Sequence, residues 1–200
     1  MTHLFIEKDR QAPPILLLHG TGGDEHSLVE LATAIAPNSS LLGIRGKVSE
    51  GGANRYFRRF AEGQFDLVDL EKQTDNLLEE VKELIGTYQL DLSQMIILGY
   101  SNGANIGAHL MLAREGGFTR GLLFHPMSLG KHDHHFPLSE SKVWLSYGEL
   151  DPIVPVETFE ELVQAFAERK ASVTAYRAVM SHGLTREELA SAKQWLEELS

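Results

Sequence analysis

Short apolar runs alternate with amphipathic segments along the whole chain. Continuous apolar runs of four or five residues are typical of strands that are buried on both faces of a sheet. Such runs predict strands at 15–19, 40–44, 95–98, 121–124 and 143–147, with an alternating strand at 173–178 and a short edge strand at 4–7. Apolar residues at helical spacing predict helices at about 24–36, 66–88, 104–114 and 158–170, and a last helix that begins at Thr185.

This alternation predicts an α/β fold with a mainly parallel central sheet and helices on both faces. The chain has 200 residues and no internal repeat or linker, so we expect a single domain over 1–200. Residues 45–65 are rich in Gly and Arg and predict a long irregular loop, a kind of segment that is often functional. No insertion is large enough for a lid domain. Asp24 is the predicted cap of the first helix, and Thr185 with Glu188 forms a capping box at the last one.

Composition narrows the class of protein. The net charge of −10 argues against nucleic acid or an anionic membrane surface as the main partner. The chain has no cysteine, which excludes disulfides, a thiolate nucleophile and a Cys-ligated metal. The first residues lack the pattern of a signal peptide, and no apolar run is as long as a membrane span. We therefore expect a cytoplasmic protein without membrane insertion.

The segment Gly99-Tyr100-Ser101-Asn102-Gly103 has the Gly-x-Ser-x-Gly pattern of a nucleophile elbow. Such a serine lies on a tight turn between a buried strand and a helix, where flanking side chains would collide with the backbone. The segment follows the predicted strand 95–98 and precedes the predicted helix 104–114. An ordinary Gly-rich turn between a strand and a helix is the alternative.

A serine nucleophile needs a histidine base, and the base needs an orienting acid. In sheets with this elbow the chain order is Ser, then Asp or Glu, then His. His182 is the only histidine beyond the turn at 148–151, and it precedes the last helix. Asp151 follows the strand 143–147 and is the expected acid, with Glu149 as its rival.

An oxyanion hole needs backbone N–H groups aimed at the attacked carbonyl oxygen. We expect these from Asn102, directly after the nucleophile, and from Thr21 in the Gly-rich loop after the strand 15–19. The same loop could be read as part of a dinucleotide-binding fingerprint. That reading is weak, because the third glycine position holds Glu25.

Taken together, these motifs resemble the phospholipase/carboxylesterase family of small α/β-hydrolases, and within it bacterial hydrolases associated with hydroquinone and quinone resistance. The matching segments are 18–23, 45–46, 57–60, 99–105, 123–127, 151–152 and 181–182. The resemblance implies a Ser–Asp–His triad at Ser101, Asp151 and His182 that hydrolyses esters or thioesters through an acyl-enzyme without a cofactor. Asn102 and the pair His125-Pro126 differ from the acyl-protein thioesterase branch, which has Gln and Ser-Gly there.

Several further residues are candidates for the substrate pocket: Arg45, Phe57, Arg58, His125 and Met127. The arginines could equally pair with acids of the helix 66–88, and the aromatic residues could pack in the core. Histidines at 132, 134 and 135 have the chemistry of metal ligands, but no helix or strand sets their spacing, so we predict a solvated loop and no metal site.

The predicted function is therefore that of a serine carboxylesterase with an open site for small or medium esters or thioesters. Its expected partner is a small-molecule ester, and the sequence leaves a homodimer open. Two alternatives remain: a small-molecule sensor or binding module on a hydrolase fold, and a hydrolase of dienelactone-like ring compounds.

Overall fold

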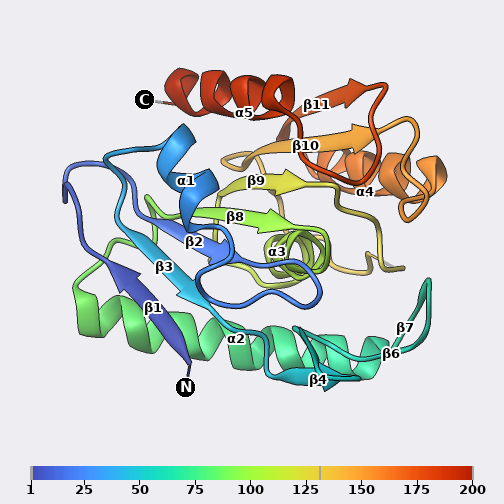
Figure 1. The fold of residues 1–200 in the computed structure, drawn as a ribbon, viewed down its shortest axis with the longest axis horizontal. Helices are drawn as coiled ribbons and strands as arrows, with labels where there is room; N and C mark the ends of the chain where they lie inside the picture. The colour runs from blue at the N-terminus through green and yellow to red at the C-terminus, as the bar shows by residue number, and fades with distance from the viewer. Residues whose placement is uncertain (1, 131, 200) are drawn as a thin grey trace.

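A seven-stranded sheet forms the centre of the computed structural model, which describes residues 2–130 and 132–199 (Figure 1). The strand order is β1-β3-β2-β8-β9-β10-β11, in which β1 is antiparallel to β3 and every other neighbouring pair is parallel. The strands of this sheet are β1 (His3–Ile6), β2 (Ile15–Leu18), β3 (Leu41–Ile44), β8 (Ile96–Tyr100), β9 (Arg120–Phe124), β10 (Lys142–Gly148) and β11 (Ser172–Ala178).

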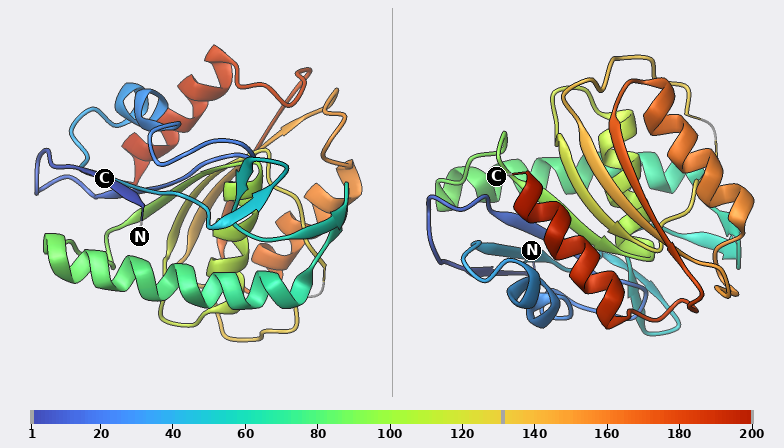
Figure 2. Two further views of the ribbon diagram at one scale, coloured as in Figure 1. Left: turned by 60° about the horizontal axis from the view of Figure 1, so that its bottom comes forward. Right: turned by 90° about the horizontal axis from the view of Figure 1, so that it is seen from above.

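Helices cover both faces of the sheet, as the apolar pattern predicts. The helices are α1 (Val29–Ile35), α2 (Leu67–Tyr88), α3 (Asn102–Ala113), α4 (Val156–Glu168) and α5 (Arg186–Glu198). The side chains of α2, α3 and α4 pack in one apolar cluster, and those of α1 and α5 pack in the other. Figure 2 shows the sheet between these two layers.

The alternation of side chains along each strand explains why the strands are continuously apolar. In β2, Leu16 and Leu18 belong to the cluster under α2, α3 and α4, whereas Ile15 and Leu17 belong to the cluster under α1 and α5. All four side chains are at most 2% exposed. A strand that is covered on both faces has no polar side, so it cannot alternate between apolar and polar residues.

Residues 45–65 are not an irregular loop, which corrects the prediction. They form two short hairpins, β4 (Val48–Glu50) with β5 (Ala53–Arg55), and β6 (Arg59–Ala61) with β7 (Gln64–Phe65). Gly51 and Gly52, at the tip of the first hairpin, have φ angles of 57° and 87°. Two successive positive φ angles are what a two-residue hairpin turn requires, and glycine adopts them without strain.

The first helix begins later than predicted. Asp24 accepts hydrogen bonds from the backbone N–H of His26 (3.0 Å) and the hydroxyl of Ser27 (2.9 Å), which makes a turn. The helix α1 starts only at Val29. The capping box at the last helix is confirmed, because Thr185 and Glu188 make both of its hydrogen bonds.

The carboxyl ends of the parallel strands meet at one edge of the sheet. Ser101 follows β8, Asp151 follows β10 and His182 follows β11. This edge is where open α/β sheets place their ligands. Within the described residues no separate lid domain covers it, and no described helix has the length and apolar character to cross a membrane.

Candidate active site

Ser101 lies on the turn between β8 and α3 in a backbone conformation that few residues adopt. Its φ and ψ angles are 51° and −114°. A non-glycine residue in such a region costs about 1–3 kcal/mol and persists only where its surroundings hold it. Here the Ser101 N–H donates to the carbonyl of Phe124 (2.9 Å), and the Ser101 carbonyl accepts from the N–H of Asn105 (2.9 Å).

The two glycines of the elbow are required by space. A Cβ at Gly103 would lie 2.0 Å from the carbonyl oxygen of Leu18, and one at Gly99 would lie 2.7 Å from the backbone nitrogen of Ala104. Both distances are far below van der Waals contact with backbone that cannot move aside. The Gly-x-Ser-x-Gly pattern therefore reflects close packing of α3 against β2 and β8.

Three predicted residues form one hydrogen-bonded chain at the sheet edge. The hydroxyl oxygen of Ser101 lies 2.9 Å from His182 Nε2, and His182 Nδ1 lies 2.7 Å from Asp151 Oδ2. Because an ionised carboxylate only accepts, Nδ1 carries the proton of a neutral imidazole. His182 Nε2 then has its lone pair directed at the serine hydroxyl, which is the arrangement that a general base needs.

Asp151 is held as a carboxylate by several donors. Its Oδ1 accepts the backbone N–H groups of Ile153 (2.8 Å) and Val154 (3.2 Å), and its side chain has no solvent exposure. Burial alone would raise the pKa of Asp151, but the hydrogen bonds from His182 and from these N–H groups outweigh it and hold the pKa below its ordinary value. Glu149, the rival acid, is exposed and is not among the groups that contact His182.

Close backbone contacts bring the acid and histidine loops together. The Leu150 N–H donates to the carbonyl of Met180 (3.0 Å), and a Cβ at Gly148 would lie 2.3 Å from the same oxygen. The hydroxyl of Tyr100 donates to the carbonyl of His182 (2.9 Å). The loop that carries His182 is therefore held both by the turn after β10 and by Tyr100 on β8.

The residues expected at the oxyanion hole lie beside Ser101. Asn102 is the first residue of α3, so its N–H has no acceptor within the helix. Thr21 follows β2 and lines the same pocket as Ser101. Arg55 donates from Nη1 to the Thr21 hydroxyl (2.8 Å), and the Gly22 N–H donates to the carbonyl of Asn54 (2.9 Å). These two hydrogen bonds thus hold the loop that carries Thr21 against the β4–β5 hairpin.

A buried polar network ties the elbow to this hairpin, and sequence reasoning missed it. The Asn102 side chain accepts the Tyr56 N–H (2.8 Å), and the Tyr56 hydroxyl donates to the carbonyl of Ile44 (2.6 Å) while it accepts the His19 N–H (3.0 Å). His19 Nε2 accepts the N–H of Gly46 (3.0 Å), so its proton is on Nδ1. Burial lowers the pKa of His19.

The comparisons with known proteins identify the family. The family model described as Phospholipase/Carboxylesterase matches residues 2–200. The chain belongs to this family. The protein named "Putative hydrolase MhqD" of Bacillus subtilis (strain 168) is 37% identical over 198 residues, which cover 99% of this chain and 98% of that protein. These findings confirm the predicted family.

Two solved structures confirm the α/β-hydrolase fold. The carboxylesterase of Bacillus cereus is 37% identical with a TM-score of 0.97, and the match covers 100% of this chain and 95% of that one. The structure of YahD with malic acid is 39% identical with a TM-score of 0.95, and covers 100% of this chain and 99% of that one.

A small cavity of about 60 Å³ opens beside Ser101. Its polar lining residues include Thr21, Arg55 and Arg59, and its apolar lining residues include Phe65, Met127 and Ile153. Of the predicted pocket residues, His125 and Met127 line this cavity, although the His125 side chain itself has no solvent exposure.

The other predicted pocket residues lie elsewhere. Arg45 makes a bidentate ion pair with Glu25 (2.6 and 2.9 Å), and Phe57 is fully buried in the core. Arg58 is exposed and pairs with Asp66 and Asp69 at the start of α2. None of the three lines the cavity beside Ser101.

The histidines of the 132–135 loop lie on a different groove. His132, His134 and His135 border an open groove of about 900 Å³ along α4, and His132 Nε2 lies 3.0 Å from the Ser128 hydroxyl. In the described part of the chain, one group has three ligand atoms close enough to hold a metal ion: His125, Asp151 and His182. The same atoms make the hydrogen bonds of the site.

Proposed function

We propose that this protein is a serine hydrolase that cleaves small or medium carboxylic esters or thioesters through an acyl-enzyme on Ser101. The observation that carries the proposal is the continuous chain from the Ser101 hydroxyl to His182 Nε2 (2.9 Å) and from His182 Nδ1 to Asp151 (2.7 Å). The membership of the phospholipase/carboxylesterase family supports it.

In the first half of the proposed reaction, Ser101 attacks the ester carbonyl while His182 takes the hydroxyl proton. Asp151 keeps the imidazole in the required tautomer and stabilises the imidazolium that forms. The N–H groups of Asn102 and Thr21 bind the oxyanion of the tetrahedral intermediate. His182 returns its proton to the leaving alkoxide or thiolate, the bond from the carbonyl carbon to the leaving group breaks, and the acyl group remains on Ser101.

In the second half, water attacks the acyl-enzyme while His182 takes one of its protons. The second tetrahedral intermediate collapses, the carboxylic acid leaves, and His182 returns the proton to Ser101. The cavity beside Ser101 is well below the 300–1,000 Å³ of pockets that hold drug-sized ligands. We therefore expect short acyl chains to be favoured over long ones.

A fluorophosphonate probe and a series of p-nitrophenyl esters test this proposal. The wild type should be labelled and should hydrolyse the acetate and butyrate esters faster than the octanoate, whereas Ser101→Ala should lose both labelling and turnover. Ser139→Ala, which changes an exposed serine in a turn, is the matched control and should behave as the wild type. An unlabelled wild type, or Ser101→Ala with wild-type turnover, would refute the mechanism.

A further inference from the structure

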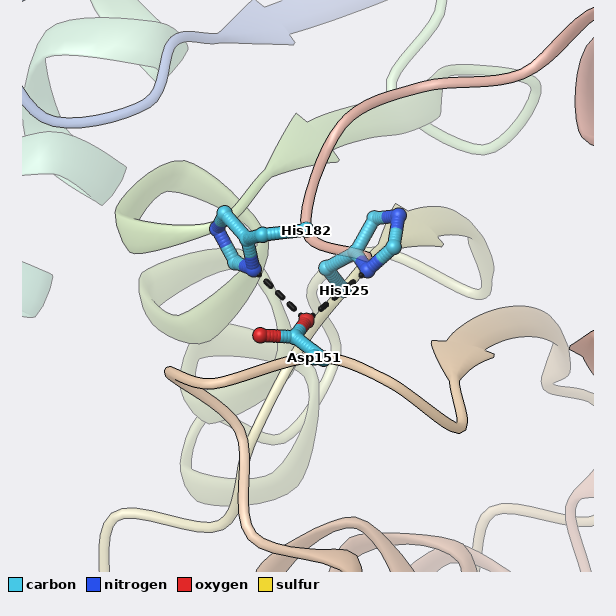
Figure 3. Close-up of side chains that lie close together, drawn as sticks. All are labelled: His125, Asp151 and His182. Carbon is cyan, nitrogen blue, oxygen red and sulfur yellow. Dashed lines mark hydrogen bonds and ion pairs between the residues drawn. The ribbon is translucent and has the colours of Figure 1, made fainter. Parts of the chain in front are cut away.

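A second histidine contacts the carboxylate of the triad. His125 Nδ1 lies 3.1 Å from Asp151 Oδ2, the same oxygen that lies 2.7 Å from His182 Nδ1. Figure 3 shows the two imidazoles converging on this oxygen from different sides. The rings of His125 and His182 are 5.0 Å apart between centroids. Asp151 is therefore bound by His125 as well as by the base.

The other nitrogen of His125 faces a second buried carboxylate. His125 Nε2 lies 3.2 Å from Glu188 Oε1, and both side chains have no solvent exposure. Neither atom has a hydrogen-bond partner in the part of the chain that the structure describes. The contact between His125 Nε2 and Glu188 Oε1 is thus an electrostatic attraction between two buried atoms.

A neutral imidazole fits this position poorly. It has one N–H donor and one lone pair, so it would turn a lone pair toward one of the two carboxylates. The carboxylate oxygen on that side would then face a lone pair instead of a donor, at 3.1 Å for Asp151 or 3.2 Å for Glu188, which is unfavourable in a buried site. An imidazolium ion has an N–H at both nitrogens and suits both neighbours.

The location of Glu188 favours its ionised form. Glu188 is the third residue of α5, and its Oε2 accepts the N–H of Thr185 (3.2 Å) in the capping box. A negative charge is stabilised at a helix N-terminus. The capping bond also fixes the carboxylate, so that its other oxygen stays directed at His125.

We propose that His125 and Glu188 form a positioning pair behind Asp151, in which His125 is an imidazolium ion held between the two carboxylates. The pair fixes the Asp151 oxygen that orients His182, and its positive member limits how readily His182 becomes charged. This inference deepens the proposed function and rests on it for its kinetic test.

Backbone strain supports a specific role for His125. Its φ angle is 50°, and Pro126 follows it, although a residue before proline is normally extended. The His125 N–H donates to the hydroxyl of the fully buried Ser146 (3.1 Å). A strained conformation at a residue that contacts the triad is typical of a functional site rather than of plain packing.

The titratable groups around His125 come from four elements. They are Asp151 after β10, His182 after β11, Glu188 on α5, and Tyr100 on β8, whose ring meets the His125 ring edge-on at 6.1 Å. Burial raises the pKa of Tyr100, and the charges of Asp151 and Glu188 add to this, so Tyr100 stays neutral. Asp151 and Glu188 are thus the two negative charges that face the His125 ring.

The pair has a predictable electrostatic effect on His182. The positive His125 ring, 5.0 Å from the His182 ring, opposes a second positive charge on His182. Glu188 lies beyond the far nitrogen of His125, so its negative charge offsets only part of this repulsion. At an effective dielectric constant of about 20, removing both charges should shift the acid limb of kcat/KM upward by about one pH unit.

Nuclear magnetic resonance of 15N-histidine protein tests the charge on His125 without any activity. At pH 7 both ring nitrogens of His125 should carry a bonded proton in the wild type. Glu188→Gln should leave one, because the Gln amide can donate to Nε2 of a neutral ring. The resonances that change in Glu188→Gln, and that vanish in His125→Asn, assign the residue. Asn is chosen because it tolerates a positive φ. One bonded proton on His125 in the wild type would overturn the proposal.

The pH dependence of kcat/KM tests the effect on the triad. Glu188→Gln should move the acid limb upward by about one pH unit and leave KM within twofold, because Glu188 does not line the cavity beside Ser101. Glu197→Gln, an exposed position on the same helix, is the matched control and should keep the wild-type profile.

A purely structural role would give a different result. If Glu188→Gln lowers the melting temperature but leaves the acid limb in place, the pair does not act on His182. If the wild type is not labelled by a fluorophosphonate, the proposed function fails, whereas the magnetic resonance result still decides the charge on His125. The assays should contain a chelator, because a metal ion bound to His125, Asp151 and His182 would displace the hydrogen bonds under study.

Discussion

Replacement of Asp151 by Asn tests the proposed mechanism most directly, because the surroundings dictate how the amide must lie. One carboxylate oxygen accepts the N–H groups of Ile153 and Val154, and the other faces the Nδ1 atoms of His182 and His125. The amide oxygen of Asn must stay with the two backbone donors, since an NH₂ group there would meet two N–H groups. The NH₂ group is then directed at the Nδ1 atoms of both histidines, which, unlike the backbone nitrogens, can give up their protons.

This orientation inverts the tautomer of the base. The NH₂ group donates to His182 Nδ1, so the ring proton moves to Nε2, which faces Ser101 at 2.9 Å. An N–H at that position cannot accept the serine proton. The expected loss in kcat/KM is about 10³–10⁴, which corresponds to about 4–5.5 kcal/mol of transition-state stabilisation.

The assay is hydrolysis of p-nitrophenyl acetate at pH 7, together with the thermal midpoint of unfolding. Asp133→Asn, the same change at an exposed position, is the matched control and should retain wild-type activity. An Asp151→Asn protein that is folded and keeps activity within tenfold of the wild type would refute the reasoning about the tautomer.

Two further predictions follow from the packing and the charges of the same region. Gly148→Ala would place a Cβ 2.3 Å from the Met180 carbonyl and separate the acid and histidine loops, so we expect a loss of about 1–3 kcal/mol in unfolding free energy together with at least tenfold in kcat/KM. Gly86→Ala, on the open face of α2, should instead be neutral or stabilising in urea unfolding; equal behaviour of the two variants would contradict the packing argument. Because burial lowers the pKa of His19 below its ordinary value of 6.5, the unfolded chain binds more protons there, and the stability that this group contributes at pH 7 is lost as the pH falls below about 6.5 toward the folded pKa. His19→Asn should therefore flatten the decrease in unfolding free energy between pH 7 and pH 5, and an unchanged slope would show that His19 is not the group responsible.

The sheet and its helices could be predicted because a strand covered on both faces has a distinct sequence pattern. The order of strand, elbow and helix around Ser101 is also local, and chain order alone selected His182. Each of these inferences depends on neighbouring residues or on the order of motifs. The family resemblance, which the comparisons confirm, rests on the same segments.

The pocket was harder to predict, because the hairpins were missed. In a strand, successive side chains point to opposite faces, so the residues of this segment that face the site cannot be assigned until its strands are recognised. Arg55 lies at the cavity beside Ser101 and Arg58 lies outside it. The Gly51-Gly52 pair between two short runs is a hairpin signal that could have corrected this. Arg45 differs, because its partner Glu25 comes from a distant turn.

The contact between Glu188 and His125 could not be predicted from either residue. The capping box accounts fully for Glu188 within its own helix, and Glu188 lies far from His125 along the chain. Only the packing of α5 across the sheet brings the free oxygen of the cap to the second nitrogen of the imidazole. The local capping motif therefore concealed a long-range contact, since one oxygen of Glu188 accepts the capping hydrogen bond and the other faces His125.

The strained residues of the site are held by bonds between loops of neighbouring strands. Ser101, after β8, is fixed by the carbonyl of Phe124 at the end of β9, and His125, after β9, is fixed by Ser146 on β10. Tyr100 then binds the carbonyl of His182 after β11. The positive φ angles of Ser101 and His125 are thus each paired with a hydrogen bond to the next strand, which is what allows a conformation costing about 1–3 kcal/mol to persist. A substitution that weakens one of these hydrogen bonds would let the backbone relax at the site. We therefore expect it to reduce catalytic activity more than it reduces the unfolding free energy.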